Sequence, residues 1–456
     1  MVSSSSGTNV AIPGRVAKAS IADTLAFLAR VMAPTLGKGM FIRRPRMVAL
    51  AARFGLDTGA VRCLQRLQRR YEADVLLLAI PGRRQAVVLS PGTLHAVLDA
   101  TPDPFAPDTR EKVAALSHFE PKTSLVSGPD ERPQRRAFND DLLESARPRH
   151  TMSDRIAIVI TEEVDHLLCE AGGALTWPLF TEAWHRAVRR IVLGDAARDD
   201  RLLTDMLAKL RRAGNWAFLH PGRPILNREY HRHLAGVLAR GEPGSLSARI
   251  AARPDHDDPA MLDQVTQWLF AFDAAGIATF RALALVVTQA GARTRAEAEI
   301  RGRTGRSAAD LLFLRACLLE SVRLWPTTPA FLRETTREVA FGDGRLPRHT
   351  QVLVFAPYFH RDESRLAVAH DFVPELWLEP HLGRRWPLVP FSEGSGTCPA
   401  HNFVPMMSST LLAAILERRS PALRSSAQLR PDHPLPGTLN HFRLAFDLRA
   451  PQGAER

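Results

Sequence analysis

Cysteine is scarce in this sequence of 456 residues, and its four copies lie far apart. They stand at Cys63, Cys169, Cys317 and Cys398, and none belongs to a C-x-x-C pair. This spacing argues against a disulfide framework and against a zinc site made of paired cysteines. It fits a reducing compartment in which one thiol has a specialised role.

Lysine is also scarce, because only five of the 60 basic residues are lysine. The net charge is +12, yet arginine is spread over the whole chain and forms no run longer than adjacent pairs such as Arg135-Arg136 and Arg211-Arg212. A stripe for nucleic acid needs clustered basic residues, so nucleic-acid binding is not predicted. An acidic protein partner agrees better with this charge, since opposite charges speed an encounter.

Long apolar runs are absent as well. No run of 18 uncharged apolar residues occurs, so no membrane span is predicted, and no secretory signal is evident. We therefore expect a cytoplasmic protein. The first 20 residues are polar and rich in serine, which predicts a disordered tail. Apolar residues make up 45% of the chain, so residues 21–456 are expected to form one large domain with a sizeable core.

Helical patterns dominate the chain, and strand patterns are short. Residues 131–320 are mostly helical, and 263–289 form the longest apolar helix. Runs at 75–80 and 85–90 predict a hairpin with a Pro-Gly turn. Further short strands are expected at 330–335, 339–341, 351–356 and 442–448. The expected fold class is therefore mainly α with small β-sheets (α+β).

Two segments lack a regular pattern. Residues 101–130 contain five prolines and predict a long loop. Residues 213–260 are interrupted by glycine and proline and predict a mobile region. Long loops in compact domains are often functional, so both segments are candidates for ligand contact.

The most informative segment is Pro390-Phe-Ser-Glu-Gly-Ser-Gly-Thr-Cys-Pro399, where Phe391, Gly394 and Cys398 form an F-x-x-G-x-x-x-C pattern. Glycine accepts backbone angles that other residues avoid, so a tight loop is predicted. Pro399 suits the first position of a helix, and residues 402–416 have the pattern of that helix. A helix N-terminus stabilises a thiolate, which is the form that ligates a metal such as iron. The alternative is a buried structural cysteine in a turn.

A second pattern, E-x-x-R, occurs four times, beginning at Glu144, Glu229, Glu320 and Glu334. Only the Glu320 copy lies in a strongly apolar helical segment. Residues three apart share one face of a helix, so Glu320 and Arg323 are predicted to form a buried structural ion pair. The other three copies are predicted to be surface ion pairs.

The order of these patterns resembles the cytochrome P450 family. A long apolar helix with Ala275-Gly276-Ile-Ala-Thr279 precedes the Glu320-x-x-Arg323 helix. Phe359-His-Arg-Asp362 and Phe372-Val-Pro-Glu-Leu-Trp377 follow, before the Phe391–Cys398 loop. The resemblance extends from about residue 70 to the end of the chain. It implies a P450-like fold with haem b between the long distal helix and the cysteine loop.

The resemblance implies roles for the residues of the loop. Cys398 would be the metal ligand, and cysteine ligation pushes electron density onto the iron. Phe391 and Gly394 would belong to the cofactor site, with Phe391 packing near the sulfur and limiting water. Pro399 removes one backbone donor behind the sulfur, which predicts a more electron-rich thiolate.

The haem propionates need cations, and arginine suits carboxylates through paired hydrogen bonds. Arg136 and Arg333 match the two arginines that the family uses. Arg132 stands four residues before Arg136, where histidine or tryptophan is more usual. The alternative for these arginines is a solvated basic face.

The resemblance makes Ala275, Gly276 and Thr279 the catalytic positions of the distal helix. Gly276 would let the helix open, and the Thr279 hydroxyl would hand protons to bound dioxygen. The family usually has an acid directly before that threonine, but this chain has Ala278. Asp273 lies about 140° from position 278 around a helix and cannot replace the acid directly. The alternative is a core helix with an incidental threonine.

Other positions also depart from the family pattern. Leu376 stands where the third member of a Glu-Arg-Arg network would be, Gly396 where a basic residue is expected, and Ala400 where glycine is common. Each change weakens one supporting contact and leaves the metal ligand in place. His360 and His370 are expected to be structural.

Four regions are expected to line a hydrophobic pocket for a small-molecule substrate. They are 101–130 with Phe105 and Phe119, 213–230 with Trp216 and Phe218, 270–275, and 327–331.

The predicted function is that of a haem-thiolate monooxygenase. It would insert one oxygen atom from O2 into a hydrophobic organic substrate, with electrons from a separate ferredoxin or flavodoxin-type donor and its reductase. A peroxide-driven peroxygenase or an isomerase on the same fold is an alternative, because Ala278 replaces the usual acid. A non-enzymatic haem-binding sensor is the alternative from another class.

Overall fold

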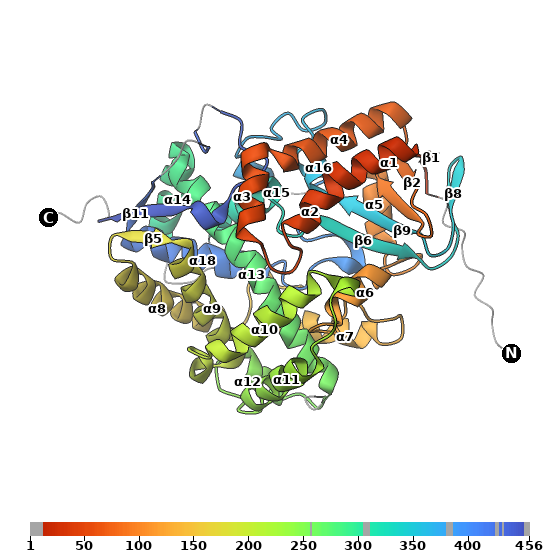
Figure 1. The fold of residues 1–456 in the computed structure, drawn as a ribbon. Helices are drawn as coiled ribbons and strands as arrows, with labels where there is room; N and C mark the ends of the chain where they lie inside the picture. The colour runs from red at the N-terminus through yellow and green to blue at the C-terminus, as the bar shows by residue number, and fades with distance from the viewer. Residues whose placement is uncertain are drawn as a thin grey trace.

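One long helix, α13 (Pro259–Thr288), runs through the middle of the molecule (Figure 1). This computed structural model describes residues 12–255, 258–303, 311–379, 386–424, 428–430 and 433–450. Asp258 caps α13 by accepting a hydrogen bond from Ala260 N, and Pro259 occupies the first turn, where its missing N–H costs nothing. The long apolar helix predicted over 263–289 is thereby confirmed.

Helices pack around α13, and their apolar faces form the larger of two main hydrophobic cores. They are α7 (Arg132–Leu142), α8 (Ser153–Ala171), α9 (Trp177–Leu193), α10 (Arg201–Gly214), α11 (Pro224–Leu238), α12 (Leu246–Ala251), α14 (Ala290–Gly302), α15 (Leu312–Leu324) and α18 (Phe403–Arg418). Trp184 of α9, Leu283 of α13 and Leu412 of α18 are among the buried members of this core.

A six-stranded sheet forms the other side of the molecule, in the order β1-β2-β3-β9-β6-β4. Its strands are β1 (Val16–Lys18), β2 (Val75–Leu78), β3 (Gln85–Val88), β4 (Phe105–Ala106), β6 (Ala330–Thr335) and β9 (Gln351–Phe355). The predicted hairpin is confirmed, because β2 and β3 are antiparallel with Val75 opposite Val88. The second main core lies between this sheet and the helices that cover it.

Most of the remaining elements are short, and helix α4 (Leu56–Tyr71) is the longest of them. Those at the N-terminal side are α1 (Ile21–Phe27), α2 (Ala33–Gly37), α3 (Pro45–Phe54), α4 (Leu56–Tyr71), α5 (Pro91–Asp99) and α6 (Arg110–Leu116). The others are β5 (Ala174–Thr176), β7 (Val339–Phe341), β8 (Gly344–Leu346), α16 (Ala356–His360), β10 (Ser420–Leu423) and β11 (Ala445–Arg449). Strands β10, β11 and β5 form one small sheet, and β7 and β8 form another. The fold class is mainly α with small β-sheets, as predicted.

Three segments that were predicted to be irregular contain regular elements. Residues 12–20 are not a tail, because Val16–Lys18 pair in parallel with β2; residues 1–11 lie outside the described residues. The proline-rich stretch 101–130 contains β4 and α6, which starts where Thr109 accepts a hydrogen bond from Lys112 N. The interrupted region 213–260 likewise contains two regular helices, α11 and α12.

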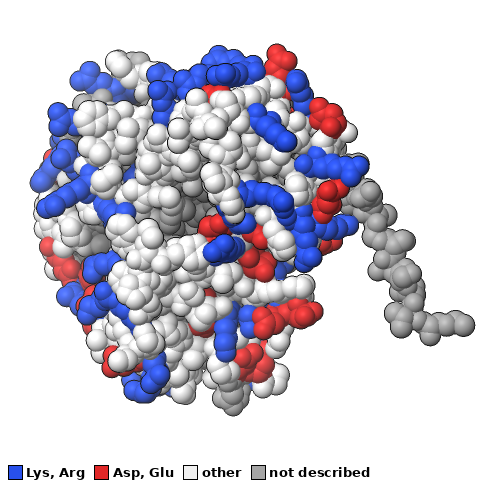
Figure 2. Space-filling view, turned by 45° about the vertical axis from the view of Figure 1, so that its right-hand side comes forward, with Lys and Arg blue, Asp and Glu red and all other residues white. Residues whose placement is uncertain are grey.

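Charged side chains of both signs are interspersed over the face shown in Figure 2, with basic ones dense along its upper edge. This distribution agrees with arginine spread evenly along the sequence. Among the described residues, only α13 is long and apolar enough to cross a membrane, and 72% of its most apolar stretch is buried inside the molecule. A buried core helix has the same length and composition, so this finding is weak evidence for a span.

Candidate functional site

Cys398 lies on a tight loop whose ends are held together by a backbone hydrogen bond, from Cys398 N to Phe391 O at 2.8 Å. Helix α18 begins at Phe403, so Pro399 lies in the turn before the helix and not at its first position as predicted. Burial raises the pKa of the Cys398 thiol, and a hydrogen bond from Ala400 N lowers it in part. A thiolate at this position therefore needs a further positive partner, such as a metal ion.

Gly394 is required at its position in the loop. Its φ is +63°, in the left-handed region that favours glycine. A Cβ on Gly394 would lie only 2.9 Å from Asp99 Cα, because the loop passes directly over the end of α5. The predicted tight loop is thus set by both backbone angle and space.

Two arginines of α7 hold the loop from one side. Arg132 Nη2 donates to Ser395 O at 2.8 Å, and Arg136 Nη1 donates to Thr397 O at 2.5 Å. The remaining donors of Arg136 pair with both carboxylate oxygens of Asp140, at 2.6 and 2.9 Å. Arg136 therefore stabilises the cysteine loop itself, and its donors are used by protein partners. Arg132 is buried and its Nε has no partner.

Arg333 of β6 approaches the loop from the other side. Its Nε donates to Thr101 Oγ1 at 2.8 Å. A Cβ on Gly396 would lie 2.5 Å from Arg333 Nη2, so the guanidinium occupies the space that a side chain at 396 would need. The basic residue that the sequence lacks at 396 is thus replaced through space by Arg333.

Lys112 of α6 completes a cluster of cations that the sequence analysis missed. Burial, followed by the charge of Arg333, lowers the pKa of Lys112 to about 7. Burial, followed by the charge of Arg132, lowers the pKa of Arg333 to about 10. Among the described residues, the charge of Asp108 counters both Lys112 and Arg132. Asp140 also acts on Arg132, but it is already paired with Arg136. Lys112, Arg132 and Arg333 repel one another, so a group with more than one negative charge among them would lower this repulsion.

Four residues of the cysteine loop, α6 and α13 have accessible surface. Cys398 and Lys112 are partly exposed, although desolvation shifts the pKa of each. Ala271 is exposed at the middle of α13, and Ala274, one helical turn later, is partly exposed. This is the pattern of side chains that border internal space.

The catalytic positions predicted on α13 lie close to the helix that follows Cys398. Thr279 is fully buried, and its Oγ1 lies 2.8 Å from Ala275 O and 2.8 Å from Ser408 Oγ of α18. A hydroxyl has one proton, so Ser408 donates to Thr279 if Thr279 donates to Ala275 O. Ser408 is a partner that no sequence signal indicated.

Gly276 has a different role from the predicted one. Helix α13 is continuous through this position and does not open. A Cβ on Gly276 would lie 2.9 Å from the Trp184 ring of α9, whose indole N–H donates to Phe272 O at 2.7 Å. The glycine therefore allows close packing of α9 on α13.

Asp273 does not take the place of the missing acid. His185 Nε2 lies 2.7 Å from its carboxylate, and Arg211 pairs with the other oxygen. Burial raises the pKa of Asp273, but the charges of Arg211 and His185 outweigh this and lower it well below its usual value. The carboxyl is thus held as a structural anion, which agrees with the prediction that Asp273 cannot replace the acid directly.

Glu320 and Arg323 form the predicted buried ion pair. Both side chains have no exposed surface, and two hydrogen bonds of 2.7 and 2.6 Å join them. Glu320 also accepts from Val373 N at 2.9 Å and from Trp377 Nε1 at 2.9 Å. The indole of Trp377 thus takes the place of the third network member, one residue after Leu376.

The surface pairs predicted for the other three E-x-x-R copies are only partly confirmed. Glu144 lies 3.9 Å from Arg147. Glu334 pairs with Arg83 instead, at 2.7 Å, and Arg337 pairs with Asp103. His360 is structural as predicted, since its Nε2 accepts from Val389 N at 3.0 Å.

Aromatic side chains beside α13 form a compact cluster. The rings of Phe41, Phe119 and Phe270 have centroids 5.5 to 5.7 Å apart. Phe41 was missed because it precedes the segments that the family pattern covers. Trp216 and Phe218 are exposed instead of lining a pocket, and Phe105 is buried in the sheet core.

Glu120 is the most unusual group next to this cluster. It is fully buried, and neither carboxyl oxygen has a hydrogen-bond partner. Burial, followed by the charge of Asp263, raises the pKa of Glu120 well above its usual value. It is therefore held in its neutral form.

Comparison with known proteins agrees with this geometry. A family model described as Cytochrome P450 matches residues 282–441, which include Glu320, Arg323, Arg333 and Cys398. A crystal structure of a cytochrome P450 superposes with a TM-score of 0.69 at 19% identity, covering 86% of this chain and 94% of that one.

This chain belongs to the cytochrome P450 family.

Sequence relatives of this P450 carry the same family name or related ones. Cyclooctatin synthase of Streptomyces melanosporofaciens is 30% identical over 232 residues, which are 47% of this chain and 50% of that protein. Fusicoccadiene C-8 hydroxylase of Alternaria brassicicola is 34% identical over 124 residues, 26% of this chain and 23% of that protein. The matched stretches thus span half or less of these relatives' length. Membership of the P450 family implies a haem cofactor.

Proposed function

We propose that this P450 is a haem-thiolate monooxygenase with Cys398 as the iron ligand and haem b as the cofactor. The observation that carries the proposal is a partly exposed thiol on a glycine-dependent loop, near three cations, of which Arg132 and Arg333 are buried and Lys112 is partly buried. When bound, the haem would supply an iron centre at which O2 is activated, and thiolate ligation favours O–O cleavage.

The residues around the loop fit the charges of haem. Haem b carries two carboxylates, and Lys112, Arg132 and Arg333 are the cations that a dianion would neutralise. An anion among them would raise the lowered pKa of Lys112 towards its usual value. Arg136 would act indirectly, by fixing the carbonyl groups of Ser395 and Thr397.

Thr279 would hold a proton at Oγ1, within a short chain from Ser408 Oγ to Ala275 O. Proton transfer through Thr279 requires a hydroxyl that can exchange partners. Ala275 would border the site with its backbone carbonyl, and Gly276 would keep α13 tightly packed on α9.

The Phe41, Phe119 and Phe270 cluster supports a hydrophobic organic substrate. Electrons would come from a separate ferredoxin or flavodoxin-type donor with its reductase. The net charge of +12 favours an acidic donor, because opposite charges speed an encounter. The expected location is the cytoplasm.

A peroxide-driven peroxygenase is the second candidate. It is favoured by one observation: Ala278 replaces the usual acid, and the nearby Asp273 is held by Arg211 and His185. Peroxide already carries the protons and electrons that O2 activation must obtain. Turnover with hydrogen peroxide, together with none from O2 and a reductase, would favour this candidate.

The proposed function is tested by replacing the thiol. In Cys398→Ser, we expect loss of the absorption band that carbon monoxide gives with reduced thiolate-ligated haem, and loss of substrate oxidation. Cys169→Ser is the matched control, because Cys169 is an exposed free cysteine away from the site. The proposal fails if Cys398→Ser keeps the wild-type spectrum, or if the protein binds no haem when porphyrin iron is supplied.

A further inference from the structure

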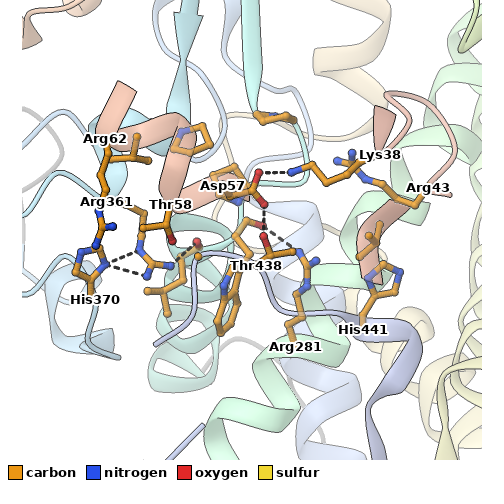
Figure 3. Close-up of a pocket in the computed structure, with 18 of the residues that line it drawn as sticks. Lys38, Arg43, Asp57, Thr58, Arg62, Arg281, Arg361, His370, Thr438 and His441 are labelled. Carbon is orange, nitrogen blue, oxygen red and sulfur yellow. Dashed lines mark hydrogen bonds and ion pairs between the residues drawn. The ribbon is translucent and has the colours of Figure 1, made fainter. Parts of the chain in front are cut away.

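A polar cavity of about 80 Å³ lies on another side of α13, between the N-terminal helices and the C-terminal segment (Figure 3). None of its lining residues belongs to the cysteine loop or to the Lys112, Arg132 and Arg333 cluster. In Figure 3, Asp57 is central, Lys38 and Arg43 lie on one side, and Arg281 and His441 lie below. The cavity is therefore a second polar site that the haem chemistry does not use.

The charges around this cavity do not balance. Five basic side chains line it, against two carboxylates, Asp57 and Glu363. The basic ones are Lys38, Arg43, Arg62, Arg281 and Arg361. Asp57 is already engaged, by an ion pair with Lys38 and by a 2.5 Å hydrogen bond from Thr438 Oγ1. Glu363 lies at the exposed rim.

Arg43 and Arg281 have only carbonyl partners. Arg43 donates to Gly39 O at 2.6 Å and to Thr327 O at 2.5 Å. Arg281 donates to Trp325 O at 3.2 Å and to Leu439 O at 2.8 Å, and its Nε has no partner. Within the described part of the chain, no carboxylate lies within ion-pairing distance of either guanidinium. Arg281 is buried and Arg43 is partly buried, and Asp57, the carboxylate whose charge acts on both, is already paired with Lys38. A cation removed from water without an ion-pair partner is costly, so these two guanidinium groups would gain from a further anion.

His441 adds an unpartnered polar group at the same point. It is 1% exposed, and neither ring nitrogen has a hydrogen-bond partner. Burial, followed by the charges of Arg281 and Arg43, lowers the pKa of His441 well below its usual value. Burial, followed by the charge of Arg43, also lowers the pKa of Arg281 to about 9. The three groups thus face one another closely enough to interact.

We propose that this cavity is a binding site for a small oxyanion, a phosphate or a carboxylate group, held by Arg43, Arg281 and His441. Guanidinium groups offer planar, paired N–H donors that match the oxygens of both anions. The cavity has room for several water molecules, each needing at least about 10–15 Å³, and so for one small polyatomic anion. Arg62 at the exposed rim would attract the anion from solvent.

The site is connected to the loop that precedes β6. Arg43 donates to Thr327 O, and Arg281 donates to the carbonyl of Trp325, at the end of α15. Thr327 belongs to the stretch 327–331 predicted to border the substrate. An oxyanion bound to Arg43 and Arg281 would therefore stabilise the loop before β6, through the hydrogen bonds that these arginines donate to its carbonyl groups.

The test measures binding of inorganic phosphate, pyrophosphate, acetate and succinate to the haem-loaded protein by titration calorimetry. Haem keeps the Lys112, Arg132 and Arg333 cluster occupied, so that it does not bind the probes. Chloride at equal ionic strength corrects for general screening. We expect saturable binding of at least one probe, and the preference between phosphates and carboxylates identifies the source of the oxyanion.

Variants separate this site from general charge effects. Arg281→Met and Arg43→Gln are each expected to weaken binding about tenfold or more, the loss of one charge-assisted interaction. Arg69→Gln is the matched control, because Arg69 is an exposed arginine of α4 outside the cavity. Asp57→Asn should tighten binding, since it frees Lys38, and a merely structural role would not predict this.

Two results would overturn the proposal. One is the absence of saturable binding by the wild-type protein with all four probes. The other is equal weakening in Arg69→Gln and in the cavity variants. If Arg281→Met does not fold, Arg43→Gln decides the question, because Arg43 is only partly buried.

Discussion

At the scale of single residues, Glu120 is a costly group, because it is buried and neither carboxyl oxygen has a hydrogen-bond partner. A buried carboxyl with no partner must stay protonated in the folded protein, whereas it ionises in the unfolded chain at about pH 4.3. The folded state therefore binds one more proton above that pH. Stability consequently falls as the pH rises from the unfolded pKa towards the raised folded pKa.

Replacing Glu120 by Gln should remove this penalty. We expect Glu120→Gln to be more stable than the wild type at about pH 7, and of similar stability at about pH 3, more than one unit below the unfolded pKa, where Glu120 is neutral in both states. Urea unfolding at several pH values measures the difference. A gain that is the same at every pH would show that Glu120 is not protonated in the folded protein.

The sequence indicated residues whose partners lie a few positions away along the chain. It did not indicate residues whose partners are distant in sequence. Cys398 and the Glu320–Arg323 pair have their signals within a few neighbouring positions. Arg333 and Gly396 are 63 residues apart, and their fit exists only after β6 and the loop meet. Lys112 was not identified from the sequence, because it lies in a stretch predicted to be a loop, where helix α6 was not expected.

At the scale of elements, the cysteine loop depends on one glycine that has no room for a side chain. Gly394→Ala meets both a left-handed backbone angle and the backbone of α5. Gly82 is a matched control, since it has a φ of +70° but no atom within 4 Å of an added Cβ.

We expect Gly82→Ala to cost about 1 kcal/mol of unfolding free energy. Gly394→Ala should cost about 1–3 kcal/mol more, because the loop must also shift. It should release haem faster as well, which transfer of haem to an acceptor protein measures. Equal losses in the two variants would mean that the space around Gly394 does not constrain the loop.

The ion pair within α15, between Glu320 and Arg323, is the second feature at this scale, because Glu320 also accepts hydrogen bonds from the segment after α16. Glu320→Gln leaves Arg323 buried with its charge uncompensated, which costs about 3–5 kcal/mol. Glu229→Gln is the control, because it alters an E-x-x-R copy at an exposed position of α11. Denaturant midpoints measure both. Surface ion pairs contribute about 0–1 kcal/mol to the free energy of unfolding. A loss of less than about 1 kcal/mol in Glu320→Gln would therefore mean that this pair behaves like a surface pair, and would contradict its burial.

Element boundaries show where sequence patterns succeed. Helix α13 and the hairpin of β2 and β3 were predicted because their apolar spacing is long or their turn residues are strong. Helix α6 was not predicted because prolines flank it, and strand β1 was not predicted because it has only three residues. Strand β1 exists because it pairs with β2, a contact between positions about 59 residues apart.

At the scale of the whole molecule, the net charge of +12 has a kinetic consequence. If an acidic protein supplies electrons, its encounter with this P450 is accelerated at low salt. We expect the rate of haem reduction by an acidic ferredoxin to fall steadily as ionic strength rises from about 0.01 to 0.5 M. Stopped-flow absorption measures this rate.

Reduction by an uncharged chemical reductant is the control, because it should not depend on salt. A ferredoxin rate that is equally insensitive to salt would show that charge does not guide the partner. Acidic side chains are interspersed among the basic ones in Figure 2, so the charge near the docking surface differs from the net charge. The steepness with which the reduction rate falls with salt therefore reports the charge around the docking surface.

Trp377 provides a last consequence. Its indole N–H donates to the carboxylate of Glu320 at 2.9 Å, in a network with no exposed surface on either charged side chain. The side-chain resonance of this tryptophan in a nitrogen-15 spectrum should therefore be displaced from those of indoles that bond to water or to carbonyls. The protein thus contains its own spectroscopic indicator of an intact ion pair, which can be followed during assembly, heating or ligand exchange without any added label at that site.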